Sequence, residues 1–433
     1  MKKTVVAFIL ICTILVSFAG CSKTAQQTQT ATEATETTGS VKPELTTEEQ
    51  QILTERRELV VKQMRDLMTV LWRTDEDITY SKNRKSEGLE NDPADKITTL
   101  KAGRLYSGVP YTHGNGSIYD WIAFATQCDE NGIYHLSGLN TDLLTGVDTM
   151  EPNRRARLGN DCADAVSWAW GFVSPTMNFT QTYDMTEANG CVKVGDFVCD
   201  PVKHSYTKEV TQQNGMEVMC KAYAQLQPGD AVVHNNSPES HAMLISQVHV
   251  ITDANGNLDM MNSYVNVIHQ TSGNLYKEKT YYDSELGEMV YYCGGVDDEY
   301  LFIDLFNGGY LPFTCVELID PAPIEEPEIL DSEDAFDFNN IASGLLISNY
   351  VMSYVTITIT DETGNKVQEG TCFVVEAELK NFDIGHFTMA QEQDVMIGKI
   401  APEELKPGNY HCTMVVKLAT GTDITVRDFD FTV

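Results

Sequence analysis

The chain has 433 residues, of which 63 are acidic and 30 are basic, so its formal net charge is −33 at pH 7. A negative surplus of this size argues against nucleic acid and anionic lipid surfaces as partners, because both carry charge of the same sign. The length indicates two or three domains once the N-terminal segment is set aside.

The N-terminal segment predicts export. Two lysines precede an apolar stretch from Thr4 to Ala19, which is too short to cross a bilayer comfortably. It ends in Phe18-Ala-Gly-Cys21, which resembles the lipobox of bacterial lipoproteins, although Leu is more usual than Phe at the first of these positions. The resemblance implies a signal peptide over residues 1–20 and lipidation of Cys21, which would anchor the protein to the bacterial membrane outside the cytoplasm.

The next segments predict a tether and then a helix. Residues 21–45 are rich in Thr, Gln, Ala and Glu and have almost no large apolar side chains, so we expect a disordered tether. Thr46-Thr-Glu-Glu49 has the pattern of a capping box, and apolar residues then repeat at helical spacing to about Trp72. A second helix is expected near Tyr119–Thr126.

The run from Gly159 to Gly171 predicts a buried helix that begins at Cys162. Cys162, Val166 and Trp170 share one face, and Gly171 stands where a helix would end. A thiol at a helix N-terminus lies near free N–H groups and the positive end of the helix dipole, which favour the thiolate. Cys162 is therefore a candidate nucleophile. The alternative is a buried structural cysteine, the commoner role of a free thiol.

Short strands dominate from residue 226 onward. Pro228-Gly-Asp230 forms a turn before one strand, His241 opens the next, and His269 ends a third. The turn Asp253-Ala-Asn-Gly-Asn257 predicts that the last two strands form a hairpin. Antiparallel pairing would bring His241 beside His269, so that Cys162 and the two histidines could serve as nucleophile, base and orienting residue.

Four pieces of the chain occur in the order found in one enzyme family. They are Gly108-Val-Pro-Tyr111, Asp161-Cys162, Pro228-Gly-Asp230 with His241 opening the following strand, and Val267-Ile-His269-Gln. Over roughly residues 100–275 the chain thereby resembles the NlpC/P60 family of papain-like cell-wall cysteine peptidases. The resemblance implies that Cys162 is the nucleophile, His241 the general base and acid, His269 the orienting residue, and Tyr111 a donor near the oxyanion.

The chain departs from the family pattern beside the nucleophile. Ala163-Asp164 stands where Ser-Gly is usual, Thr112-His113-Gly114-Asn115 replaces a common Trp-Gly-Gly, and the gap from Tyr111 to Cys162 is unusually long. These differences bear on substrate preference more than on fold. His113 is a surface residue or a substrate contact, and His234 has no counterpart in the pattern and ranks below His241 as the base.

Beyond residue 318 the composition and the pattern of apolar residues change. Residues 319–336 form an acidic, Pro-rich linker, and residues 337–433 contain alternating runs with regular turns, as in Tyr354–Thr360. We expect an α+β papain-like domain over residues 46–318, followed by an all-β sandwich over residues 337–433 that resembles immunoglobulin-like bacterial domains. The sandwich would be a spacer or would bind a wall or protein ligand.

Nine cysteines remain after Cys12 and Cys21 are set aside. No CxxC or HExxH motif is present, so we expect no zinc and no cofactor. Connectivity cannot be deduced from the sequence, and Cys372 with Cys412 is the one disulfide pairing that we expect.

The leading hypothesis is a lipid-anchored hydrolase that cuts an amide in peptidoglycan stem peptides through an acyl-enzyme on Cys162. One alternative is an amidase of CHAP type, in which an acidic residue or an asparagine such as Asn262 or Asn266 would replace His269. The other is an inactive surface lipoprotein whose papain-like domain binds wall peptides.

Overall fold

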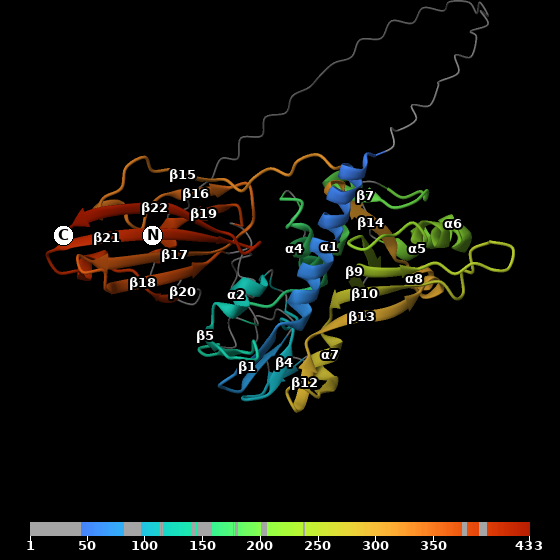
Figure 1. Ribbon diagram of the computed structural model, residues 1–433, viewed down its shortest axis with the longest axis horizontal. Helices are drawn as coiled ribbons and strands as arrows, with labels where there is room; N and C mark the ends of the chain where they lie inside the picture. The colour runs from blue at the N-terminus through green and yellow to red at the C-terminus, as the bar shows by residue number, and fades with distance from the viewer. Residues whose placement is uncertain are drawn as a thin grey trace, which may run out of the picture. The chain divides into compact units, whose positions relative to one another are not determined.

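The computed structural model describes residues 45–81, 97–112, 114, 116–139, 144, 158–175, 177, 181–200, 206–236, 239–374, 379–388 and 396–433. The predicted signal peptide, the predicted lipidation site Cys21 and the predicted tether up to residue 44 lie outside the described residues, as does His113. The described chain is of α+β class with mostly β-sheet (Figure 1).

Helix α1 (Thr47–Thr69) begins at the predicted capping box. The Thr46 hydroxyl accepts a hydrogen bond from the Glu49 N–H at 3.2 Å, and the Glu49 carboxylate accepts from the Thr46 N–H at 2.7 Å. The helix ends three residues before Trp72, which lies in the first strand. In the described part of the chain, no helix is both long and apolar enough to cross a membrane.

One six-stranded sheet has the order β11-β12-β4-β1-β6-β5. Its strands are β1 (Leu71–Thr74), β4 (Leu105–Ser107), β5 (Ala125–Cys128), β6 (Tyr134–Leu136), β11 (Thr280–Asp283) and β12 (Glu288–Tyr292), and a separate pair is formed by β2 (Ile78–Ser81) and β3 (Ile97–Leu100). The helix expected near Tyr119–Thr126 is shorter than predicted: α2 covers Ile118–Ile122, because residues 125–128 pair with β6 as a strand.

A second six-stranded sheet carries the predicted histidines. Its order is β13-β10-β9-β8-β14-β7, and the paired neighbours are all antiparallel. The strands are β7 (Cys191–Lys193), β8 (Ala231–Asn236), β9 (Glu239–His249), β10 (Tyr264–Gln270), β13 (Gly294–Leu301) and β14 (Leu311–Cys315). The turn between β9 and β10 closes with Asp253 N–H donating to the Asn257 carbonyl at 2.8 Å, so the hairpin prediction is confirmed.

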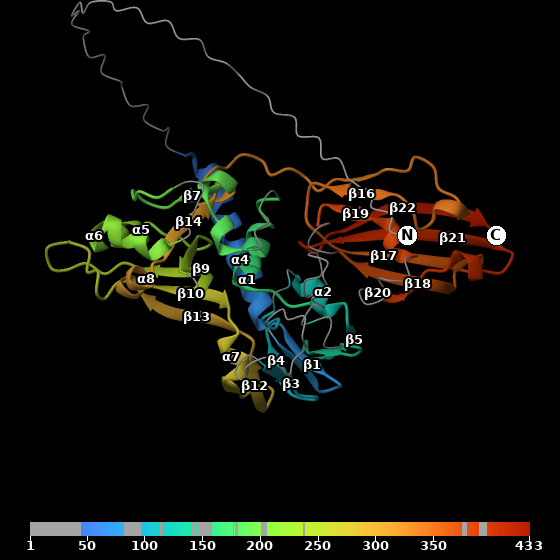
Figure 2. The same cartoon turned by 180° about the vertical axis from the view of Figure 1, so that it is seen from behind.

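Two helices that are far apart in the sequence pack on this second sheet. Helix α1 and helix α4 (Cys162–Trp170) contact each other, and both contact β9 and β10 (Figures 1 and 2). Further helices in the described residues are α5 (Thr207–Asn214), α6 (Met216–Tyr223), α7 (Gly273–Tyr276) and α8 (Phe302–Gly308), with short 3₁₀ turns at Thr182–Asp184, Glu187–Asn189, Val316–Leu318, Phe338–Asn340, Ile384–Phe387 and Pro402–Glu404.

The turn Pro228-Gly-Asp230 connects helices α1 and α4 to the second sheet. Arg57 of α1 forms a buried ion pair with Asp230 at 2.8 Å and also donates to the Pro228 carbonyl. The indole N–H of Trp170 in α4 donates to the Gly229 carbonyl at 2.8 Å. Burial raises the pKa of Asp230, while Arg57 acts in the opposite direction. A turn that is common in isolation therefore has a specific packing role here.

The C-terminal part is a β-sandwich with its own hydrophobic core. A five-stranded sheet has the order β20-β18-β17-β21-β22 and a three-stranded sheet the order β15-β16-β19, with antiparallel neighbours in both. The strands are β15 (Ile329–Asp331), β16 (Leu345–Ser348), β17 (Met352–Asp361), β18 (Lys366–Phe373), β19 (Asn381–Asp383), β20 (Met396–Lys399), β21 (Asn409–Leu418) and β22 (Asp423–Thr432). The predicted linker boundary was wrong, because β15 lies within residues 319–336 and pairs with β16.

The expected pairing of Cys372 with Cys412 is also wrong. Cys372 lies opposite Val355 on one side of β17, whereas Cys412 lies opposite Ile359 on the other side. The two cysteines are thus about 10 Å apart across the strands and about 13 Å apart along them. A disulfide needs α-carbons within about 7 Å.

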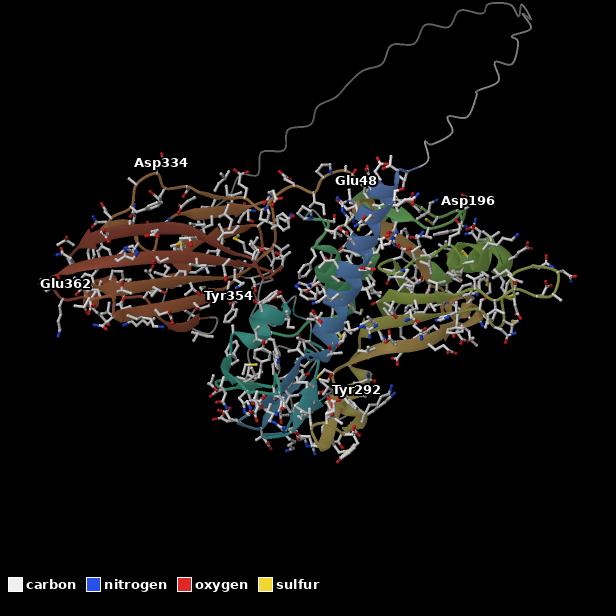
Figure 3. All side chains as sticks on the ribbon, viewed as in Figure 1. Glu48, Asp196, Tyr292, Asp334, Tyr354 and Glu362 are labelled. Carbon is white, nitrogen blue, oxygen red and sulfur yellow. The ribbon has the colours of Figure 1, made fainter. Side chains whose placement is uncertain are left out.

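Some of the acidic residues lie at the surface. Glu48, Asp196, Asp334 and Glu362, which are labelled in Figure 3, are all exposed. Exposed carboxylates of this kind keep a protein soluble through mutual repulsion, and they do not specify a fold.

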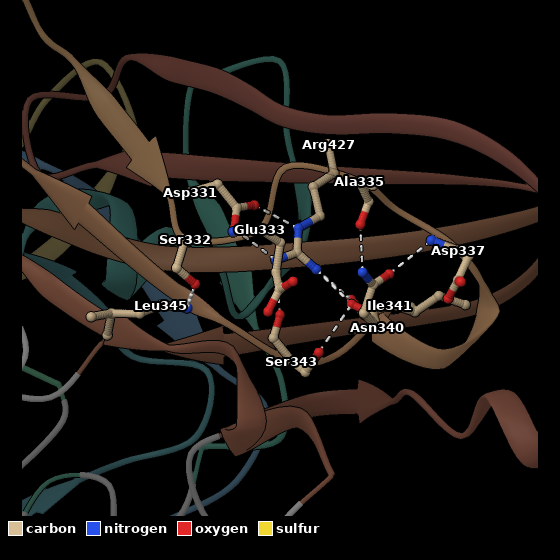
Figure 4. Close-up of polar contacts among 10 residues, drawn as sticks. All are labelled: Asp331, Ser332, Glu333, Ala335, Asp337, Asn340, Ile341, Ser343, Leu345 and Arg427. Atoms are coloured by element: carbon tan, nitrogen blue, oxygen red, sulfur yellow. Dashed lines mark hydrogen bonds and ion pairs between the residues drawn. The ribbon is translucent and has the colours of Figure 1, made fainter.

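One buried arginine holds the start of the sandwich to its last strand. Arg427 of β22 is 1% exposed and forms a two-fold hydrogen-bonded ion pair with Asp331 of β15, at 2.6 and 2.9 Å (Figure 4). Its guanidinium also donates to the carbonyls of Asn340, Ile341 and Ser343 at 2.7, 3.3 and 2.8 Å. Because the fork of donors is filled, the buried charge is compensated.

We expect Arg427→Met to destabilise the sandwich by ~3–5 kcal/mol, because it removes the cation paired with the carboxylate of Asp331 and the guanidinium hydrogen bonds to three carbonyls. The matched control is Lys366→Ala, which breaks the exposed ion pair with Glu369 in the same sandwich and should cost less than about 1 kcal/mol. Urea unfolding of both variants measures the difference. Equal stabilities would contradict the role given to Arg427.

Candidate active site

Strands β9 and β10 bring the two predicted histidines into direct contact. His241 Nε2 lies 2.7 Å from His269 Nδ1, and the rings meet edge to face with centroids 4.9 Å apart. The two strands are antiparallel, with a register shift between Asn266 and Val267. The sequence predicted that the histidines would be neighbours, and the structure adds which nitrogen atoms meet.

A carboxylate completes this row from the other side of β10. Asp298 of β13 places Oδ2 2.9 Å from His269 Nε2. His269 itself is 5% exposed, whereas Asp298 lies at the rim. The hydrogen bond from His269 lowers the pKa of Asp298, which is therefore ionised at neutral pH. Sequence reasoning missed Asp298, which stands in an acidic run without any motif.

Cys162 begins α4, as predicted, and its thiol faces the strand that carries His241. Asp161 caps the helix by accepting hydrogen bonds from the N–H groups of Ala163 and Asp164 at 2.9 and 3.0 Å. The backbone N–H of Ala242, the residue after His241, is directed at the Cys162 sulfur. Cys162 therefore lies beside the segment that carries His241.

The expectation that the helix N-terminus favours a thiolate is wrong for this resting structure. Cys162 is 5% exposed, and burial raises its pKa well above the ordinary value. The charges of Asp161 and Asp164 add to this effect, and the N–H groups of Ala242 and Ala163 only partly oppose it. Cys162 is thus a neutral thiol, which requires a base to become a nucleophile.

His241 has the protonation state that such a base needs. Burial lowers its pKa well below the usual value, and the neighbouring His269 and His234 lower it further. His241 is therefore neutral at neutral pH and can accept a proton. His234 lies opposite His241 on β8, but its ring packs on Tyr310 at 4.6 Å and its Nδ1 lies 3.0 Å from the Asn236 amide nitrogen. These contacts place His234 beside the row and not within it.

Tyr111 lies at the same site, held by a short parallel bridge to Asn160. Burial raises the pKa of Tyr111, and the negative charges of Asp161 and Asp164 raise it further. The phenol therefore stays protonated and can donate a hydrogen bond. Gly159, with φ of +79°, lets the two loops approach, because a Cβ there would lie 2.6 Å from the Pro110 carbonyl.

Gln270 links three of the four sequence pieces. It follows His269 directly and is fully buried. Its amide nitrogen donates to the Val109 carbonyl at 2.6 Å and to the Asn160 side-chain oxygen at 3.1 Å. The loop of Tyr111, the entry to the Cys162 helix and the strand of His269 are therefore bonded to one another. Sequence reasoning included Gln270 in the pattern but gave it no role.

Two tyrosines that the sequence did not single out extend the site. Tyr300 packs edge to face on His269 at 6.2 Å, and Tyr310 lies 6.5 Å from Tyr300. Burial raises the pKa of Tyr310, and the charge of Glu239 contributes in the same direction. These rings give the site an aromatic side on which an extended or planar group could pack.

Asn262 and Asn266, the alternative third residues of a site of CHAP type, form hydrogen bonds with groups other than His241. Asn266 places its side-chain oxygen 2.9 Å from His249 Nε2 and donates to the Asp297 carbonyl. Asn262 donates to Asp259 at 2.8 Å. The group against His241 is His269. Among the described residues, no group of three or more His, Cys, Asp or Glu side chains is arranged to hold a metal ion.

Comparison with known proteins adds little to this geometry. No protein-family model matches the chain, and no curated protein matches it. One solved structure that is similar in part is a tetra-tandem repeat in the extending region of a large adhesion protein, with 12% identity and a TM-score of 0.16. The match covers 47% of this chain and 40% of that chain.

We expect the reactivity of Cys162 toward iodoacetamide to depend on His241. Because the resting thiol is neutral and buried, His241→Ala should slow alkylation at pH 7 by about tenfold or more. Cys128 is exposed, so it provides an internal control within the same protein and should react at the same rate in both variants. Peptide mass spectrometry over time measures both rates. Equal rates at Cys162 would contradict the assignment of His241 as its base.

Proposed function

We propose that the protein is a cysteine hydrolase of NlpC/P60 type that cleaves an amide bond in peptidoglycan stem peptides. The observation that carries the proposal is that Cys162 faces the His241 segment through the Ala242 N–H, and that His241 contacts His269 with 2.7 Å between the two imidazoles. The order of these groups is that of a nucleophile, a base and an orienting residue. The specific papain-like fold is part of this proposal.

The first step is acylation. As the Cys162 sulfur attacks the amide carbonyl carbon, His241 takes the thiol proton and becomes an imidazolium. The carbonyl oxygen gains negative charge, which the N–H of Cys162 and the phenol of Tyr111 would stabilise by hydrogen bonds. The imidazolium then protonates the leaving nitrogen, the C–N bond breaks, and a thioester remains on Cys162.

The second step is hydrolysis of the thioester. His241, again neutral, accepts a proton from water, and the resulting hydroxide attacks the thioester carbonyl. The proton returns to the sulfur as the C–S bond breaks, which releases the acid and restores the thiol. The lowered pKa of His241 suits this role, because the base must be neutral at the start of each step.

Substrate class and location rest on the sequence. The four ordered pieces resemble a family that acts on wall peptides, and the N-terminal segment resembles that of a lipoprotein. A lipid on Cys21 and a tether would hold the enzyme within reach of the wall, with the sandwich as a spacer or as a binding module for a wall or protein ligand. The amidase of CHAP type is less favoured, because a histidine contacts His241 at the third position.

A second candidate is a protein that binds wall peptides without cleaving them. The observation that favours it is the neutral, 5% exposed thiol of Cys162. Retention of the protein on purified sacculi without release of fragments would support binding alone.

Cys162→Ala should abolish the release of stem-peptide fragments from purified sacculi, because the thioester can no longer form. The control is Cys128→Ala, which removes an exposed thiol and should leave release unchanged. Chromatography with mass spectrometry of the soluble products measures the release. Fragments released equally by Cys162→Ala and the unchanged protein would rule out Cys162 as the nucleophile.

A further inference from the structure

We propose that Asp298 is a positioning residue that sets the tautomers of both histidines, and that Gly295 is present because it makes room for this contact. The inference rests on the proposed hydrolase function and adds a fourth member to the row. Its geometry comes from β13, which pairs with the opposite edge of β10 from β9.

The assignment follows from counting protons along the row. An ionised carboxylate can only accept, so His269 Nε2 must carry the hydrogen that it shares with Asp298 over 2.9 Å. His269 Nδ1 then has a lone pair and accepts from His241 Nε2 over 2.7 Å. The remaining nitrogen of His241, Nδ1, is left with the lone pair. Asp298 thus makes Nδ1 the basic atom of His241, although the two residues do not touch.

Gly295 shows how closely this contact is packed. It lies directly opposite His269 in the β10–β13 pair. A Cβ at Gly295 would lie 2.3 Å from His269 Nε2 and 2.5 Å from the Asp298 Oδ2 atom. Both distances are too short for any side chain, so the hydrogen bond occupies the space above this glycine. The register shift between Val267 and His269 accompanies this arrangement.

The neighbouring carboxylate has a different role. Asp297 forms an ion pair with Arg65 at 2.7 and 2.9 Å and accepts from Ser246 at 2.7 Å. The charged or titratable groups near Asp298 are His269, Lys279, Asp297, Tyr292 and Tyr300. Lys279 attracts and Asp297 repels the Asp298 charge. Two adjacent aspartates thus provide a natural comparison of one carboxylate inside the row with one outside it.

The charge of Asp298 also supports catalysis when His241 becomes an imidazolium. A negative group at the end of the row stabilises that cation through the shared hydrogen bonds. Loss of the charge should lower the pKa of His241 and move the acidic limb of the pH–rate profile to lower pH, because His241 acts as a base only when it is neutral. Loss of the acceptor oxygen should in addition allow both histidines to exchange between their two neutral tautomers.

The test compares Asp298→Asn, Asp298→Ala and the control Asp297→Asn in the full chain. Asp298→Asn keeps an acceptor oxygen and loses the charge, so we expect kcat for stem-peptide release to fall about tenfold with little change in KM, and the acidic limb to shift to lower pH. In Asp298→Ala, kcat should fall further, because the acceptor oxygen is lost as well as the charge. Asp297→Asn keeps φ of 55° accessible and should stay within about twofold of the unchanged protein.

Nitrogen-15 NMR of the imidazoles reads the tautomers directly. We expect protonated Nε2 in both His241 and His269 of the unchanged protein and of Asp297→Asn, and mixed tautomers in Asp298→Ala. Identical spectra and pH profiles in all the variants would overturn the proposal. A fall in kcat without a change of tautomer or pH limb would also overturn it, because that pattern indicates a merely structural residue.

The iodoacetamide rate at Cys162 separates this inference from the proposed function, since it needs no substrate. If the unchanged protein releases no fragments while Asp298→Ala slows alkylation of Cys162 and Asp297→Asn does not, the hydrolase proposal fails and the role of Asp298 stands. Equal alkylation rates in both variants would overturn the role of Asp298 whether or not fragments are released. Gly295→Ala gives an independent check, because it should slow alkylation while leaving the carboxylate in place.

Discussion

The candidate site depends on one strand having two antiparallel partners. Strand β10 pairs with β9 on one side and with β13 on the other, so that His269 meets His241 at 2.7 Å and Asp298 at 2.9 Å. A shift of one residue in either pairing would turn a side chain to the other face of the sheet and break the row. The buried amide of Gln270 then joins this strand to the loops of Tyr111 and Cys162.

Burial sets the resting chemistry of the site. A helix N-terminus contributes typically ~0.3–1 kcal/mol toward an anion, whereas burial of a titratable group can shift a pKa by up to about 3–5 units, at about 1.4 kcal/mol a unit. Burial therefore outweighs the helix dipole at Cys162, and it also keeps His241 neutral. The two groups rest as thiol and imidazole, and charge appears only when the proton moves from one to the other. Such a pair is protected from adventitious oxidation, which requires a thiolate.

Local patterns predicted the elements of the site better than its connections. The capping box of α1, the start of α4 at Cys162 and the hairpin between β9 and β10 follow from local rules, and the pairing of His241 with His269 follows from the hairpin. Asp298 and Gly295 could not be found in this way, because they matter only through the register of β13 against β10. The pairing expected for Cys372 failed for the same reason, since spacing along the chain does not give the order of strands. The raised pKa of Cys162 depends on packing by segments that are distant in sequence.

The central claim is that Cys162 carries the acyl group, with His241 as its base. The most direct test is mass spectrometry of the protein quenched with acid during reaction with stem peptides. The account predicts an added acyl mass on the peptide that contains Cys162, which hydroxylamine removes and which His241→Ala does not form. Release of fragments without any adduct on Cys162, or with the adduct on another residue, would contradict it.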